Sequence, residues 1–123
     1  MCKMKKTNTL LFFVILLLSS CSYQSLERAS RNYKADKDYA SLQVIYKHLD
    51  EGMKRTEVER LLGEPDYPPI EGQYYFSTDH SEYPKDGATD RVKVTVGLVI
   101  DYRNQLGGLT DELQTFWLGL IGE

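Results

Sequence analysis

Apolar residues occupy every second position in one stretch near the end of the chain. From residue 92 to residue 102 each even position is Val, Leu, Ile or Tyr, whereas the odd positions include Lys93, Thr95 and Asp101. Side chains of a β-strand point to opposite faces in turn. This period of two therefore predicts a strand over 92–102 with one face on a core and one face towards water.

A longer period marks a helix over residues 38–49. Three apolar residues share one face of this segment, namely Leu42, Ile45 and Leu49. Asp36 or Asp38 can cap the first turn, where an acidic side chain also meets the positive end of the helix dipole. Gly52 follows the last turn and suits a left-handed backbone position.

A second, shorter helix is predicted directly afterwards. Thr56 and Glu59 have the spacing of a capping box, in which each side chain bonds the other residue's backbone amide. The apolar contacts of this helix come from Val58, Leu61 and Leu62. Gly63 is expected to end the helix, and Pro65 prevents it from resuming.

The remaining segments favour β-structure. Residues 72–77 are aromatic and β-prone, and they predict a strand. Residues 77–91 are expected to form a long polar loop, since they contain Pro84 and a Lys-Asp-Gly turn. Residues 110–121 fit helix or strand spacing, and we expect a strand. The predicted fold is α+β, with two N-terminal helices packed on a roughly three-stranded antiparallel sheet.

The N-terminus has the pattern of an export signal. Residues 1–6 contain three lysines and no acid, residues 10–18 are all apolar, and small residues follow. Nine helical residues span about 14 Å, roughly half of a ~30 Å hydrocarbon core, so this segment is too short to cross a membrane. The sequence Leu-Ser-Ser-Cys at 18–21 resembles the lipobox of bacterial lipoproteins.

The lipobox resemblance implies a particular processing of the chain. In such lipoproteins the chain is cut before the cysteine, the sulfur receives a diacylglyceryl group, and the new amine is often acylated, for example with palmitate. We therefore expect a lipoprotein signal peptide over 1–20, a lipidated flexible tether over 21–37 with Cys21 as lipid anchor, and a domain over 38–123. The alternative is an ordinary signal peptide followed by a free cysteine.

Removal of the leader also changes the charge balance. The chain has 15 Lys and Arg against 18 Asp and Glu; loss of the three leader lysines leaves 12 basic residues, so the formal net charge falls from −3 to −6. Nucleic acid repels a polyanion, and no basic cluster with interleaved aromatic residues occurs, so we exclude nucleic-acid binding. Cys2 lies in the leader and Cys21 is the lipid site, so the domain has no disulfide and depends on its hydrophobic core.

The segment between the two predicted helices carries a family motif. Gly52-Met53 is followed by a polar stretch, by Val58, and by Leu62-Gly63 with Pro65. This pattern resembles the SmpA/OmlA (BamE-like) family of small outer-membrane lipoproteins, over roughly residues 42–102. The resemblance implies an α+β domain of the cell envelope, anchored in the outer membrane and facing the periplasm. Related helix-helix-sheet units occur in secreted inhibitors resembling β-lactamase inhibitory protein.

Two non-catalytic functions remain open. One is an interaction or scaffold module, associated with an outer-membrane protein complex as in the resembling family. The other is an inhibitor or immunity-type lipoprotein that binds a secreted enzyme or toxin. His48, and His80 with its acidic neighbours, match no catalytic or metal-binding spacing, so we expect no enzyme, no metal and no cofactor. Ser22 follows the lipid site and favours the outer membrane, because an aspartate there retains lipoproteins at the inner membrane in enteric-type bacteria.

Aromatic side chains are the candidate contacts for a protein partner, because they supply large contact area at low entropic cost. Tyr74 and Phe76 share one face of the predicted strand, and Tyr75, which lies between them in sequence, belongs to the opposite face. We expect the first two in the core and Tyr75 exposed. Tyr83 lies in the middle of the long polar loop. Tyr75 and Tyr83 are thus the predicted partner-binding residues.

Overall fold

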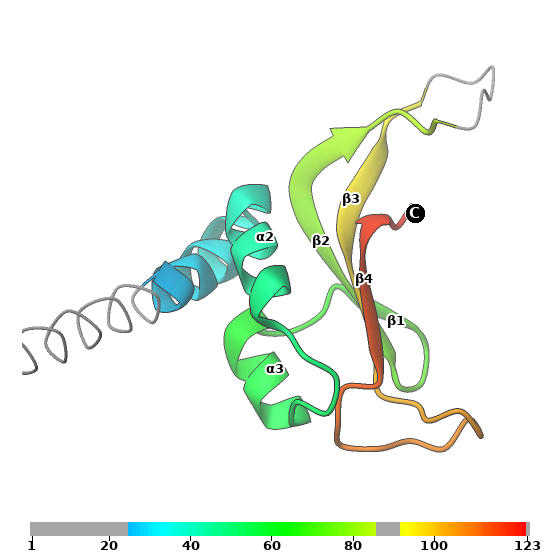
Figure 1. Cartoon of the computed structure of the whole chain (residues 1–123). Helices are drawn as coiled ribbons and strands as arrows, with labels where there is room; N and C mark the ends of the chain where they lie inside the picture. Colours follow the sequence, from blue (N-terminus) through cyan, green and yellow to red (C-terminus); the bar gives the residue numbers. More distant parts are fainter. Residues whose placement is uncertain (1–24, 86–91, 123) are drawn as a thin grey trace, which may run out of the picture.

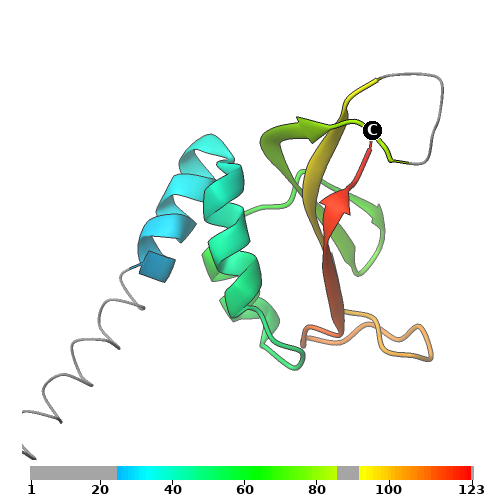
Figure 2. The same cartoon turned by 45° about the horizontal axis from the view of Figure 1, so that its top comes forward.

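The computed structural model describes residues 25–85 and 92–122, and the leader with Cys21 lies outside these residues. Within them, three helical segments precede a four-stranded antiparallel sheet in which each strand pairs with the next along the chain. Both Figure 1 and Figure 2 show the helices gathered on one side of the sheet. The α+β class is confirmed, with one helix and one strand more than expected. The elements are a helix over 25–36, α2 (Tyr39–His48), α3 (Arg55–Leu62), β1 (Tyr67–Ile70), β2 (Gln73–Glu82), β3 (Val94–Asp101) and β4 (Thr115–Leu120).

The prediction of a flexible tether over 21–37 is wrong for residues 25–36. Residues 25–36 form a helix that buries Leu26, Ala29 and Tyr33, three positions on one helical face. The Tyr33 hydroxyl donates to the carbonyl oxygen of Ser77 at 2.7 Å, and burial raises the pKa of this phenol well above its usual range. The Ser30 hydroxyl donates to the α3 backbone at 2.8 Å. The segment is polar in composition because only this narrow stripe faces the core.

The predicted boundaries of α2 are confirmed, whereas the capping box of α3 is wrong. Asp38 caps α2, since its carboxylate accepts the backbone amide of Ser41 at 3.0 Å. Helix α3 begins one residue before Thr56, with no side-chain cap. One reason is tertiary, because the Arg55 amide donates to the distant Asp111 carbonyl at 2.8 Å. The other lies within the helix, where the Glu59 carboxylate pairs with the Arg55 guanidinium at 2.7 Å. Gly63 ends α3 at φ +76°, as expected.

The long polar loop expected over 77–91 is wrong for residues 77–82, which continue β2 to Glu82. The sheet register shifts between Ser77 and Ser81, so this part of β2 contains a bulge. At the bulge, the Asp79 amide donates to the carbonyl of Lys37 at 2.9 Å, just before α2. The polar residues of this segment therefore bond the helical layer and do not form a free loop.

The hydrophobic core lies between the helices and the even-numbered face of the sheet. Leu98, Ile100 and Tyr102 are buried there as predicted, and β4 confirms the strand expected near the C-terminus. The predicted apolar face is wrong at its start, because Val94 is only partly buried and Val92, before β3, is 67% exposed. The opposite face of β3 does not meet water as expected, because Gly97 and Val99 are also buried. Strand β3 lies between β2 and β4, so side chains of these two strands lean over its outer face as well as its core face. No described helix is long and apolar enough to cross a membrane.

Candidate protein-binding face

The sheet carries a row of large side chains on the face opposite the helices. Tyr67 pairs with Tyr75 between β1 and β2, Tyr75 pairs with Val99, and Val99 pairs with Trp117. Directly opposed residues of antiparallel strands project from the same face. These four residues, one from each strand, therefore form a line across the sheet, which we call the outer-face row. The helices cover the other side of the sheet (Figure 2).

The outer-face row combines exposed ends with a packed centre. Trp117 is 45% exposed and Tyr67 is 38% exposed, whereas Val99 between their strands is 1% exposed. The rings of Tyr67 and Tyr75 contact each other at a tilt of 60°, with 5.0 Å between centroids. Ile70, the last residue of β1, is 49% exposed and pairs with Gln73. It adds apolar surface at the end of this strand. The arrangement presents aromatic surface on a rigid sheet, as protein interfaces do.

Small residues next to the outer-face row set the shape of the surface. Ser77, Gly97 and Gly119 pair across β2, β3 and β4 in the neighbouring register position. A Cβ atom at Gly97 would lie 2.6 Å from Cδ1 of Ile121, so Ile121 packs directly over this glycine. A Cβ atom at Gly119 would lie 3.3 Å from the ring of Trp117. The tryptophan ring therefore leans along its own strand over Gly119.

An ion pair borders the other side of the outer-face row. Asp101 and Arg103 form a two-point contact, with Nη2 to Oδ2 at 2.6 Å and Nε to Oδ1 at 3.0 Å. Hydrogen bonds from Arg103 hold the pKa of the Asp101 carboxyl below its ordinary value. The residues paired with Asp101 on the adjacent strands, Gln73 and Thr115, are uncharged. The face is thus an uncharged aromatic strip bounded by a neutralised charge pair.

The alternation of Tyr74 and Tyr75 is held in place by Arg55. The Arg55 guanidinium lies 4.9 Å from the ring centroids of both Tyr74 and Tyr102, and its Nη2 donates to the Tyr74 hydroxyl at 3.0 Å. Cation–π contacts of this kind stabilise a partly buried guanidinium. Tyr74 is thereby fixed on the helix side of β2, and Tyr75 lies on the outer face as predicted. Tyr75 is half-buried there, whereas the sequence predicted it to be exposed.

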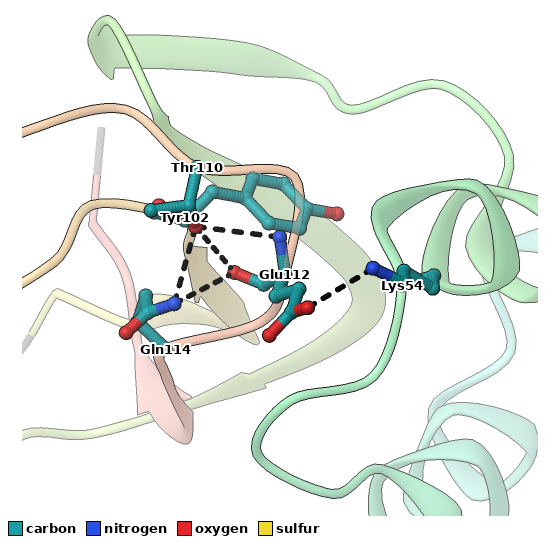
Figure 3. Close-up of polar contacts among 5 residues, drawn as sticks. All are labelled: Lys54, Tyr102, Thr110, Glu112 and Gln114. Carbon is teal, nitrogen blue, oxygen red and sulfur yellow. Dashed lines mark hydrogen bonds and ion pairs between the residues drawn. The ribbon is translucent and has the colours of Figure 1, made fainter.

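Hydrogen bonds around the Thr110 hydroxyl hold the start of β4, the strand that carries Trp117, in position (Figure 3). The Thr110 hydroxyl donates to the carbonyl of Tyr102 at 2.6 Å and accepts from the side-chain amide of Gln114 at 3.1 Å. The Glu112 carboxylate pairs with Lys54 Nζ at 3.0 Å. These contacts bind the start of β4 to the end of β3 and to the residue before α3, so Trp117 stands on a braced strand.

The predicted partner-binding residues are not brought together. Tyr75 lies in the outer-face row, whereas Tyr83 follows the far end of β2, 53% exposed, with Lys93 Nζ 5.6 Å from its ring centroid. Sequence reasoning missed Tyr67 and Ile70, because the Pro-Pro pair between them reads as a turn. Their own β-prone side chains flanking the prolines were the available signal.

His80 and its acidic neighbours make contacts with α2 and with each other, and His48 lies in the last turn of α2. His80 Nε2 lies 3.0 Å from Glu82 Oε1 at the surface, and the His80 ring stacks on Tyr39 with 4.5 Å between centroids. Asp79 accepts the backbone amide of Tyr39 at 3.1 Å, at the start of α2. No group of three metal-ligating side chains occurs among the described residues. Residues 86–91, which include two further aspartates, lie outside them.

Comparisons with protein-family models, with functionally described proteins and with solved structures found no match for this chain.

Proposed function

We propose that this chain is a lipid-anchored protein of the bacterial envelope that acts as a non-catalytic interaction module. In this proposal it belongs to the SmpA/OmlA (BamE-like) type, sits at the outer membrane facing the periplasm, and binds a protein partner within an outer-membrane complex. The outer-face row is the observation that carries the binding role. No nucleic acid, metal or cofactor takes part.

The chemistry of the row supports protein binding. Tyr67, Tyr75 and Trp117 are residue types enriched at the energetic centres of interfaces. Tyr67 and Trp117 are exposed at the two ends of the row, and Tyr75 is half-buried between them. The strip is uncharged, so a partner does not have to desolvate charges in order to cover it. Each of these side chains stands on a strand that is paired with a neighbour in the sheet, so its backbone is already ordered before a partner binds.

The position of the N-terminal helix brings this domain close to the proposed anchor. Three residues, 22–24, separate Cys21 from the helix at 25–36, and the four steps from residue 21 to residue 25 reach at most about 14 Å. A sixteen-residue tether would have reached about 50 Å. A lipidated Cys21 would hold the domain next to the bilayer, which favours a partner that is itself at the membrane surface.

We expect Cys21→Ala to release the protein from membranes. Two or three acyl chains, at about 0.8 kcal/mol per buried CH₂, hold a protein firmly, and nothing among the described helices replaces them. The measurement is metabolic labelling with a palmitate analogue together with density fractionation of the envelope. The unchanged chain should be labelled and should travel with the outer membrane. A Cys21→Ala chain that is still labelled and membrane-bound would reject the lipid assignment.

We expect Tyr75→Ala and Trp117→Ala each to weaken partner capture about fivefold or more, which corresponds to ~1 kcal/mol. The full lipidated chain would be purified from its own envelope after chemical cross-linking, and the captured protein would be quantified by mass spectrometry. Leu106→Ala is the matched control, because Leu106 is 97% exposed on the loop between β3 and β4. Its capture should equal that of the unchanged chain.

The same experiment tests two remaining points. Tyr83→Ala reports whether the contact extends to the end of β2, as the sequence predicts. The identity of the captured protein separates a membrane-complex subunit from the secreted enzyme or toxin that an inhibitor would bind. Full capture by a folded Tyr75→Ala, Trp117→Ala double variant would reject the outer-face row as the interface.

A further inference from the structure

The two edges of the sheet differ in how well they are protected. Strand β1 has four residues, contains Pro68 and Pro69, and shifts register against β2 between Tyr67 and Ile70. Prolines and irregular pairing are common devices that stop an edge strand from accepting another strand. Strand β4 at the other edge has six residues, Thr-Phe-Trp-Leu-Gly-Leu, without a proline or a charge. Among the described strands, β4 therefore has the edge that is open to pairing.

The hydrogen bonds of β4 identify which backbone groups are open. The Ile121 amide donates to the Thr95 carbonyl at 3.0 Å, so the odd-numbered residues of this segment bond β3. In an antiparallel pair, alternate residues direct their amide and carbonyl groups to opposite sides of the strand. The amides and carbonyls of Phe116, Leu118 and Leu120 therefore point away from β3, towards the open edge.

The open stretch begins at a defined point. Just before β4, the same side of the chain is closed by residues 52 and 53, because the Gly52 amide donates to the Leu113 carbonyl at 2.7 Å and the Leu113 amide donates to the Met53 carbonyl at 2.8 Å. Beyond Thr115 the sheet order gives β4 no second neighbour among the described residues. An incoming strand thus has five residues, 116–120, with which to pair.

We propose that β4 pairs with β4 of a second copy of this chain, antiparallel and about a two-fold axis at Leu118. This register sets Leu118 opposite the partner's Leu118, and Phe116 opposite the partner's Leu120, as hydrogen-bonded pairs. Trp117 then lies opposite the partner's Gly119, so the largest side chain of the strand faces the smallest. A register centred on Trp117 would instead oppose two tryptophans.

Two observations favour a second copy of this chain as the source of the strand that pairs with β4. Self-pairing about a two-fold axis brings each charge of a strand near its own copy across the axis, and β4 carries no charge. The protected β1 edge also ends the assembly at two chains, because each chain offers one open edge only. The result is a continuous eight-stranded sheet in which the two outer-face rows meet. This pairing does not depend on the proposed function, since β4 is present whether or not the row binds a partner.

Register-specific cross-linking tests the pairing. Full chains carrying Trp117→Cys and Gly119→Cys would be co-expressed and oxidised in the membrane, because opposed residues of a non-hydrogen-bonded pair come close enough for a disulfide. We expect a cross-linked dimer from the mixture and none from Gly119→Cys alone or from the parent chain. A dimer from Trp117→Cys alone, in place of the mixed one, would overturn the register. Absence of every cross-link would overturn the pairing.

A charge on the open edge provides the second test. Trp117→Lys places two lysines about 7–8 Å apart across the proposed axis and removes the tryptophan contact, so we expect the dissociation constant of the dimer to rise about tenfold or more. The matched control is Ile70→Lys on the protected edge, which should leave the dimer unchanged. Analytical ultracentrifugation of the detergent-solubilised full chain gives the mass. A parent chain that is monomeric in this measurement would overturn self-pairing.

Discussion

Tyr33→Ala is expected to lower the free energy of unfolding by about 4 kcal/mol, because it empties a large site in the core. Tyr33 is 0% exposed, and its ring belongs to the helix over 25–36, which the polar composition of that segment conceals. Its hydroxyl donates to the Ser77 carbonyl at the bulge of β2, so the substitution also leaves a backbone oxygen without its donor. The measurement is urea denaturation of the full chain in detergent, followed by circular dichroism.

Two further variants test the causes of the stability loss expected for Tyr33→Ala. Tyr33→Phe keeps the ring and removes only the hydrogen bond, so we expect a loss of about 1 kcal/mol. Tyr83→Ala removes the same side chain from an exposed site and should change stability by about 0.5 kcal/mol or less. If Tyr33→Ala cost no more than Tyr83→Ala, the N-terminal helix would not be part of the cooperative core.

Gly97→Ala is expected to lower the free energy of unfolding by about 3 kcal/mol, although it adds a single methyl group. The new Cβ would lie 2.5 Å from the carbonyl oxygen of Phe76 and 2.6 Å from Cδ1 of Ile121. The first of these contacts is with the backbone of β2, so a change of side-chain rotamer cannot relieve it. Strands β2 and β3 must separate locally, which weakens the most extensive pairing in the sheet. The same urea titration measures the loss.

Gly119→Ala is the matched control for Gly97→Ala. Its Cβ would meet only the ring of Trp117, at 3.3 Å, and a side chain on the outer face can turn away. We expect a change of less than about 1 kcal/mol. Equal costs at the two glycines would show that the effect comes from the residue type and not from the closeness of the β2 backbone.

Local signals in the sequence were sufficient for the elements whose partners lie within the same segment. Helix α2 combines an apolar stripe with an aspartate that caps its own first turn, and both act within a few residues. The even positions of β3 alternate strictly, so its core face was predictable before its neighbours were known. The alternation at Tyr75 likewise predicted one candidate contact residue. The α+β class and the core-facing side of these two elements follow from these periodicities.

Tertiary contacts decided the elements whose backbone or side-chain partners are distant in the chain. Residues 25–36 are polar, and their helix is stabilised where Tyr33 and Ser30 meet β2 and α3. Helix α3 begins earlier than predicted because Asp111 accepts the Arg55 amide. Strand β2 is longer than predicted because its bulge bonds the residue before Asp38. The outer-face row depends on the register of all four strands, since Tyr67 and Trp117 are fifty residues apart in sequence and share a face only through pairing. Periodicity describes which face of an element is apolar, but the free energy that selects partners for these faces comes from packing between segments, which no local pattern contains.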